Sequence, residues 1–161
     1  MDSTSLRTAY VNLLDAAEHV SALDMHAAVP PGEWNAEQQL AHLITVDAGI
    51  LSVVSTIAAG APATFDNRLS LETHNLARIS GQAGGRTHMI ERVRAQGQAL
   101  CQVVEHLSGD ELDQLIPTLL RSADTLLVDR PLSLRELLTG IAEDHLPRHA
   151  QQLLALTPVS A

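Results

Sequence analysis

The stretch LSLRELLTGIAEDHLPRHAQQL, residues 132–153, decides the fold class of this chain. In it Glu136 follows Ser133 by three residues, the spacing of a capping box at the start of a helix. Apolar residues and histidines then recur at intervals of three and four, which is the period of one helix face. The pattern predicts a helix over about 133–156 with one inward stripe: Leu134, Leu137, Leu138, Ile141, His145, His149 and Leu153.

Similar stripes lie outward from this stretch, toward the N-terminus. Asn35 and Gln38 form a second capping-box pattern, and Gly60 and Pro62 end the helix that it starts. We predict four long helices, over about 5–25, 36–59, 86–107 and 133–156, and short helical pieces near 71–79 and within 108–117. Long helices with one apolar stripe each pack most simply as a four-helix bundle, here with a long crossover between the second and third helices.

The composition favours a single all-α domain over residues 1–161. Apolar residues make up 45% of the chain, but aromatic residues only 2%, so the core consists mainly of Leu, Val, Ile and Ala. A β-sandwich depends more on aromatic and β-branched residues. At this length the chain can bury one sizeable core.

Charge and hydropathy exclude two classes of partner. The formal net charge is −9, and all ten basic residues are arginine, with no basic patch that could neutralise nucleic-acid phosphates. The apolar segment 43–63 is interrupted by Asp47, and its uncharged remainder is too short for a membrane span of roughly 20 residues. No signal-peptide pattern opens the chain. We therefore expect a soluble cytoplasmic protein, in which the single Cys101 is a buried, inert thiol.

His145 and His149 are the residues of the last stripe that indicate chemistry. Four positions apart on a helix, two imidazoles lie on one face and can bind one cation. An imidazole that points into an apolar interior needs a polar partner, because an unsatisfied polar group there costs roughly 1–3 kcal/mol. A metal ion is one such partner, and a carboxylate or a backbone carbonyl is another.

His42 would supply a third ligand, because it lies near an apolar face of the second predicted helix. The alternative is a histidine that only forms a hydrogen bond near a helix end. Asp47 is either the polar edge of its helix, the interpretation we favour, or an acceptor that fixes an imidazole tautomer. The remaining histidines have no partner at helical spacing, and we interpret them as surface or loop residues: His19, His26, His74, His88 and His106.

Pro147 lies between His145 and His149 in the last predicted helix. Its ring removes the hydrogen bond to the carbonyl of Glu143 and clashes with that carbonyl. We expect the helix either to kink there or to restart with Pro147 in its first turn. Either change would alter the approach of the two histidines to each other.

Four pieces of the sequence, in order, resemble the DinB-like (YfiT-like) superfamily of metal-dependent enzymes. They span nearly the whole chain, and the most specific combination is a tryptophan ahead of a His-Leu helix with a late HxxxH followed by glutamine. The pieces are EWNAEQQLAHL (33–43), THNLARI (73–79), LSGDELDQLIP (107–117) and LSLRELLTGIAEDHLPRHAQQL (132–153). Pro147 within the HxxxH departs from the family pattern.

This resemblance implies a four-helix bundle, commonly a homodimer, in which three histidines bind zinc, nickel or a similar divalent ion. By position the ligands would be His42, His145 and His149. Characterised relatives include S-transferases that use bacillithiol or mycothiol and a mycothiol-dependent maleylpyruvate isomerase. Arginine-only basicity is typical of GC-rich genomes, and in an actinobacterial source mycothiol would be the expected thiol.

The hypothesis is therefore an enzyme whose metal ion activates a low-molecular-weight thiol of the mycothiol type for transfer to a small electrophile. Two other interpretations stay open. One is a non-catalytic helical module for binding or dimerisation, with a structural metal ion or none. The other is a metal-dependent hydrolase or a thiol-dependent isomerase.

Overall fold

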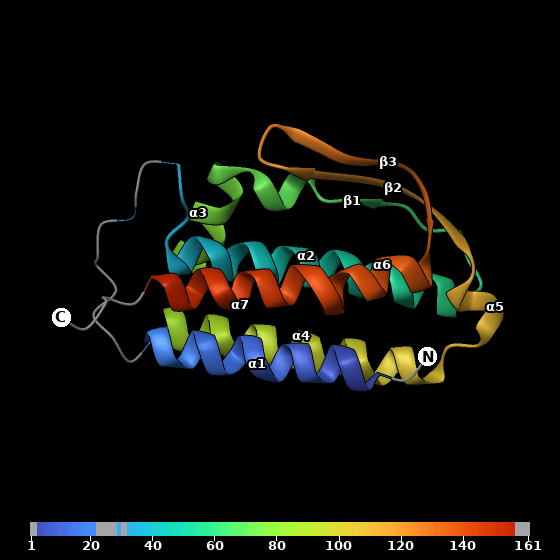
Figure 1. Ribbon diagram of the computed structural model, residues 1–161, viewed down its shortest axis with the longest axis horizontal. Coiled ribbons are helices and arrows are strands. Elements are labelled where there is room, and N and C mark those ends of the chain that lie inside the picture. The colour runs from blue at the N-terminus through green and yellow to red at the C-terminus, as the bar shows by residue number, and fades with distance from the viewer. Residues whose placement is uncertain (1–2, 22–28, 30–31, 157–161) are drawn as a thin grey trace.

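A computed structural model describes residues 3–21, 29 and 32–156 of the chain. In these residues the protein is mostly helical, with one small sheet (Figure 1). The long helices are α1 (Thr4–Ser21), α2 (Ala36–Ala58), α4 (Arg86–His106) and a C-terminal rod made of α6 (Leu134–Gly140), η2 (Ile141–His145) and α7 (Leu146–Ala155). The short elements are β1 (Phe65–Asp66), η1 (Arg68–Leu71), α3 (Thr73–Gln82), α5 (Gly109–Leu112), β2 (Leu115–Ser122) and β3 (Thr125–Ser133).

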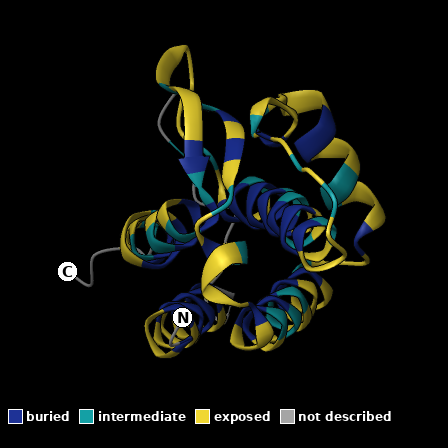
Figure 2. Cartoon of the chain, turned by 90° about the vertical axis from the view of Figure 1, so that its right-hand side faces the viewer, coloured by how far each residue is buried: buried dark blue, intermediate teal, exposed yellow. Residues whose placement is uncertain are grey.

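The long helices lie side by side and bury their apolar faces against one another. α1 packs against α7 and α4, and α2 packs against α4, α3 and α7. In the view along the helices the buried residues face the space that the helices enclose, while the exposed residues lie on the outside (Figure 2). In α4 the buried residues include Ile90, Val93, Gly97, Leu100 and Val104, and Tyr10 of α1 approaches closely at Gly97.

The predicted helix boundaries are confirmed where local capping signals set them. Asn35 with Gln38, and Ser133 with Glu136, each form both hydrogen bonds of a capping box. A third box, Ser108 with Glu111, starts the short helix α5. The expected end of the first helix, residues 22–25, lies outside the described residues.

The sheet is the part of the fold that the sequence analysis did not predict. β2 and β3 form an antiparallel hairpin, and β1 pairs with β2 in parallel. The hairpin lies on the outside of α2 and the C-terminal rod, with its closed end above α7 (Figure 1). The prediction of an all-α chain is thus confirmed only for the helical majority of the fold.

The helix α2 is long and apolar enough to cross a membrane by length and composition alone. In the structure 61% of its most apolar window is buried by the rest of the protein. The core helix of a soluble protein has the same properties.

The C-terminal rod contains a wide turn at η2. Its five residues are π-helical, and the Leu146 N–H closes the turn by donating to the carbonyl of Ile141, five residues earlier. Pro147 follows at once, near the start of α7, where its missing N–H is tolerated. Of the two outcomes that the proline allowed, the structure shows the restart.

Candidate metal centre

Three imidazoles from two segments of the chain converge beside α2 and α7. His42 lies on α2, His145 is the last residue of η2, and His149 is one turn further on α7. The ring centroids are 5.3 Å apart for His42 and His145, 4.8 Å for His42 and His149, and 4.6 Å for His145 and His149. The trio predicted from spacing is therefore one cluster in space.

The π-helical turn determines which way the two late histidines face. An α-helix would place His145 on the core side after Ile141, as the sequence stripe predicted. The wide turn holds one extra residue, so Leu146 takes the core position and is 0% exposed, while His145 is only half-buried. His145 and His149 stay within one α-helical turn of each other, and Pro147 does not separate them.

A backbone carbonyl fixes the orientation of His42. Its Nδ1 lies 2.8 Å from the carbonyl oxygen of Ser70, and because a carbonyl only accepts, Nδ1 must carry the proton. The lone pair is therefore on Nε2. Ser70 is held in turn by the 3₁₀ segment η1, where its hydroxyl donates to the Asn67 carbonyl at 2.6 Å. The ring of Trp34 lies tilted beside that of His42, with a centroid distance of 4.8 Å.

The other two imidazoles each have a buried nitrogen without a hydrogen-bond partner among the described residues. These atoms are Nε2 of His145 and Nδ1 of His149. A buried, unsatisfied polar atom is costly, and native structures rarely leave one without a reason. Both histidines belong, with His42, to a group whose ligand atoms are close enough to one another to hold a metal ion.

Burial keeps the three imidazoles neutral. It lowers the pKa of His42 to about 4, against a smaller opposing effect of the Ser70 hydrogen bond. Burial, followed by the charges of His42 and Arg148, lowers the pKa of His149 to about 3. The pKa of His145 is also well below its ordinary value, first through burial and then through its histidine neighbours. Neutral imidazole is the form that binds a metal ion.

A shared divalent ion would require the three ligand nitrogens to lie slightly closer together than they do in the structure. One ligand nitrogen from each histidine lies within 4.8 Å of the other two. An ion with bonds of about 2.1 Å to imidazole requires ligand nitrogens no more than roughly 4 Å apart.

The histidine cluster opens onto the main cavity of the protein, which has a volume of about 1170 Å³. α2 and the C-terminal rod form its floor, and the β2–β3 hairpin forms its roof. Gln39, one turn before His42, lies in its wall with an unpartnered buried Oε1. Phe65, Asn67, Leu71 and Thr73 also line the cavity, as do residues of the hairpin, which the sequence did not predict.

Asp47 corrects the interpretation that we favoured. It is not the polar edge of α2 but is 0% exposed, and it accepts a hydrogen bond of 2.8 Å from the hydroxyl of Tyr10. It does not fix an imidazole tautomer either, because Ser70 does so for His42. Cys101 is buried, as predicted.

The remaining described histidines, His19, His74, His88 and His106, are exposed, as expected. His26 lies outside the described residues. No family model, curated protein or solved structure matches the chain.

Proposed function

We propose that this protein is a metal-dependent enzyme in which His42, His145 and His149 hold one divalent ion, zinc or nickel. The ion would activate a low-molecular-weight thiol of the mycothiol type for transfer to a small electrophile. The observation that carries the proposal is the pair of unpartnered buried nitrogens that meet a third, oriented imidazole beside a large cavity.

Three neutral imidazoles leave a bound ion its full positive charge and an open coordination position, so that it lowers the pKa of a thiol and favours the thiolate at neutral pH. The protein's own residues prepare this position. Ser70 orients His42, Trp34 packs beside its ring, and the cavity leaves room for a small electrophile next to the histidines. In the transfer, sulfur bonds to the electrophilic carbon, the leaving group departs with its electron pair, and the thiol proton passes to solvent.

The wider assignment follows from the same resemblance that suggested the ligands. We propose that the four long helices form a four-helix bundle of the DinB-like type. We also propose that the protein is a cytoplasmic homodimer. The arrangement of α1, α2, α4 and the C-terminal rod around one core supports the bundle.

Metal content tests the proposal. Protein purified without an affinity tag and equilibrated with zinc should bind about one ion per chain, measured by elemental analysis after gel filtration. His145→Ala should lose this ion, because only two ligands remain. His88→Ala is the matched control, since His88 is exposed and bonds only to the Gly84 carbonyl at 2.9 Å.

Zinc-loaded protein should then consume a thiol and an electrophile in a stoichiometric reaction that His145→Ala abolishes. If the electrophile reacted with water and not with the thiol, the protein would be a hydrolase and not a transferase. A wild-type protein that binds no zinc or nickel at micromolar concentration would leave only the non-catalytic module.

A further inference from the structure

Cationic side chains face the cavity from three elements of an otherwise acidic protein. Arg121 lies on β2, Arg130 on β3 and Arg148 on α7, and all three line the cavity. The chain as a whole has a formal charge of −9. Three carboxylates, those of Glu33, Glu136 and Asp144, line the same cavity, so the three guanidiniums differ in whether an acidic partner is within reach.

Two of these arginines already face carboxylates. Arg148 donates to both carboxylate oxygens of Asp144, at 2.7 and 2.8 Å. Arg130 lies 3.9 Å from the carboxylate of Glu136. Arg121 differs, since no carboxylate of the described residues lies within 4.0 Å of its guanidinium nitrogens. Among the residues that the structure describes, its side chain donates to the carbonyl of Asp124, at 2.8 Å.

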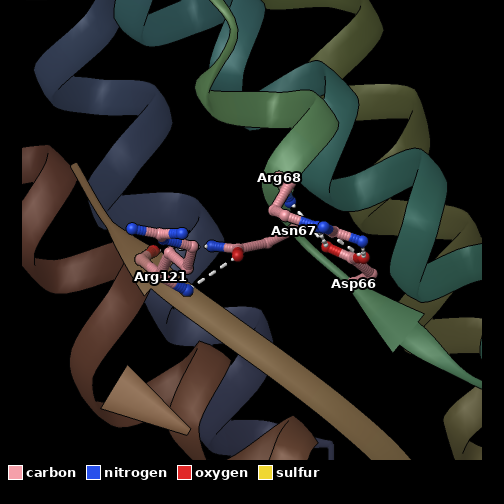
Figure 3. Close-up of polar contacts among 4 residues, drawn as sticks. All are labelled: Asp66, Asn67, Arg68 and Arg121. Carbon is pink, nitrogen blue, oxygen red and sulfur yellow. Dashed lines mark hydrogen bonds and ion pairs between the residues drawn. The ribbon is translucent and has the colours of Figure 1, made fainter. Parts of the chain in front are cut away.

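The backbone of Arg121 is fixed by an amide clamp (Figure 3). The Asn67 side chain accepts a hydrogen bond from the Arg121 N–H and donates one to the Arg121 carbonyl, each 2.8 Å long. The pairing of β2 with β3 shifts register between Leu120 and Arg121, where Leu127 of β3 is the extra residue. The clamp thus holds the strand firm at the point where Arg121 faces the cavity.

Arg68, which lies close to Asn67 in the sequence, differs from Arg121 because it already pairs with a carboxylate. Arg68 forms several hydrogen bonds with the carboxylate of Asp66, the shortest 2.6 Å, and does not line the cavity. In Figure 3 this ion pair lies on one side of Asn67 and Arg121 on the other. The segment therefore neutralises one cation outside the cavity and leaves the other available inside it.

We propose that Arg121 binds a carboxylate of the small molecule that occupies the cavity. This inference rests on the proposed function, because it places the carboxylate at the roof of the same cavity whose floor carries the histidines. A guanidinium presents two parallel N–H donors that match a carboxylate, and in a partly enclosed site such a pair is stronger than at the surface. The ligand class is thus a small carboxylate with a metal-binding or reactive group at its other end.

Matched probes test the assignment by calorimetric titration of the zinc-loaded protein. 3-Mercaptopropionate and 3-mercaptopropionamide differ only in the carboxylate. Wild-type protein should bind the carboxylate between about tenfold and a hundredfold more tightly than the amide. Arg121→Met should remove this preference, and Arg121→Lys should keep part of it. Arg135→Met is the control, because Arg135 pairs with Asp113 outside the cavity and its loss should leave the preference intact.

A second pair of probes separates this inference from the proposed function. 3-Phenylpropionate and 3-phenylpropionamide contain no thiol and are titrated into metal-free protein. A carboxylate preference that disappears in folded Arg121→Met supports the assignment even if no metal ion ever binds. Equal affinity for acid and amide in the wild-type protein, or a preference that survives in Arg121→Met, overturns it.

Discussion

Two buried polar clusters include a residue of α2, His42 in one and Asp47 in the other. They differ in whether their unpartnered atoms adjoin the cavity. In the histidine cluster, free nitrogens of His145 and His149 lie beside the remaining lone pair of His42 and a large cavity. In the second cluster, Asp47 is paired with Tyr10, and its other oxygen has no partner among the described residues. Neither Asp47 nor Tyr10 lines the cavity.

Burial perturbs the pKa values in both clusters, but in opposite senses. It raises the pKa of Asp47 to about 7 and lowers that of His42 to about 4, so both groups are driven toward their neutral forms. A perturbed pKa alone therefore does not distinguish the two clusters. The distinction is convergence: several free lone pairs with adjoining space make a ligand site, while one paired carboxyl in a packed core is structural.

The largest expected effect concerns the ionisation of Asp47. Its folded-state pKa is about 7 and its ordinary value 3.8, so the folded protein binds the proton more tightly than the unfolded chain. Stability from this group is complete below about pH 4 and is lost as the pH rises to 7. The full loss is up to about 4 kcal/mol, since one pKa unit corresponds to about 1.36 kcal/mol.

Asp47→Asn keeps an acceptor for Tyr10 and cannot ionise, so it should escape this loss. Urea unfolding at pH 4 and pH 8 measures the free energy of unfolding of both proteins. The variant should gain stability relative to the wild type between the two pH values. If the free energies of unfolding of the variant and the wild type differed by the same amount at both pH values, burial would not raise the pKa of Asp47.

The next effect tests which cluster binds metal. Zinc at about a hundred times its Kd should raise the free energy of unfolding of the wild-type protein by about 2.7 kcal/mol. His42→Ala should lose most of this gain, whereas Tyr10→Phe should keep it. Thermal or urea unfolding with and without zinc measures the gain. If zinc stabilised His42→Ala as much as the wild-type protein, the histidine cluster would not be the zinc site.

The smallest effect concerns packing around the tyrosine. A Cβ at Gly97 would lie 2.7 Å from Cδ1 of Tyr10, so Gly97→Ala should destabilise the protein by about 1–3 kcal/mol. Gly81→Ala is the control, because a Cβ there has nothing within 4 Å and alanine favours a helix by up to about 1 kcal/mol. Denaturant unfolding of the two variants should give changes of opposite sign. Metal binding should be unaffected in both.

The sequence predicted the helices because their signals are local. The capping boxes at Asn35 and Ser133 and the periodic stripes between them are set by neighbours three or four residues away. The hairpin has no such signal. Its strands carry Pro117 and Pro131 opposite each other, and its turn uses Ala123 with a φ of 48° where glycine would have marked it.

The candidate site was predictable only in part, for the same reason. His145 and His149 are four residues apart and His42 lies near an apolar face of its helix, so local patterns indicated all three, and the family resemblance implied the same set. The carbonyl of Ser70 and the guanidinium of Arg121 reach the site from η1 and the hairpin. A backbone carbonyl leaves no mark on the amino-acid sequence, and an arginine in an unrecognised strand resembles any surface arginine.

The π-helical turn at η2 divides the C-terminal rod into two parts, α6 before it and α7 after it. Its first half, α6, is anchored by its own cap and by the end of the hairpin. Its second half, α7, presents the two late histidines at an angle set by how many residues the turn contains. Removing one residue there would rotate α7 by about 100° and exchange Leu146 for its neighbours on the core side. The number of residues in this turn therefore sets where His145 and His149 lie relative to α2, and a change in it would also alter the packing of α7 against α1.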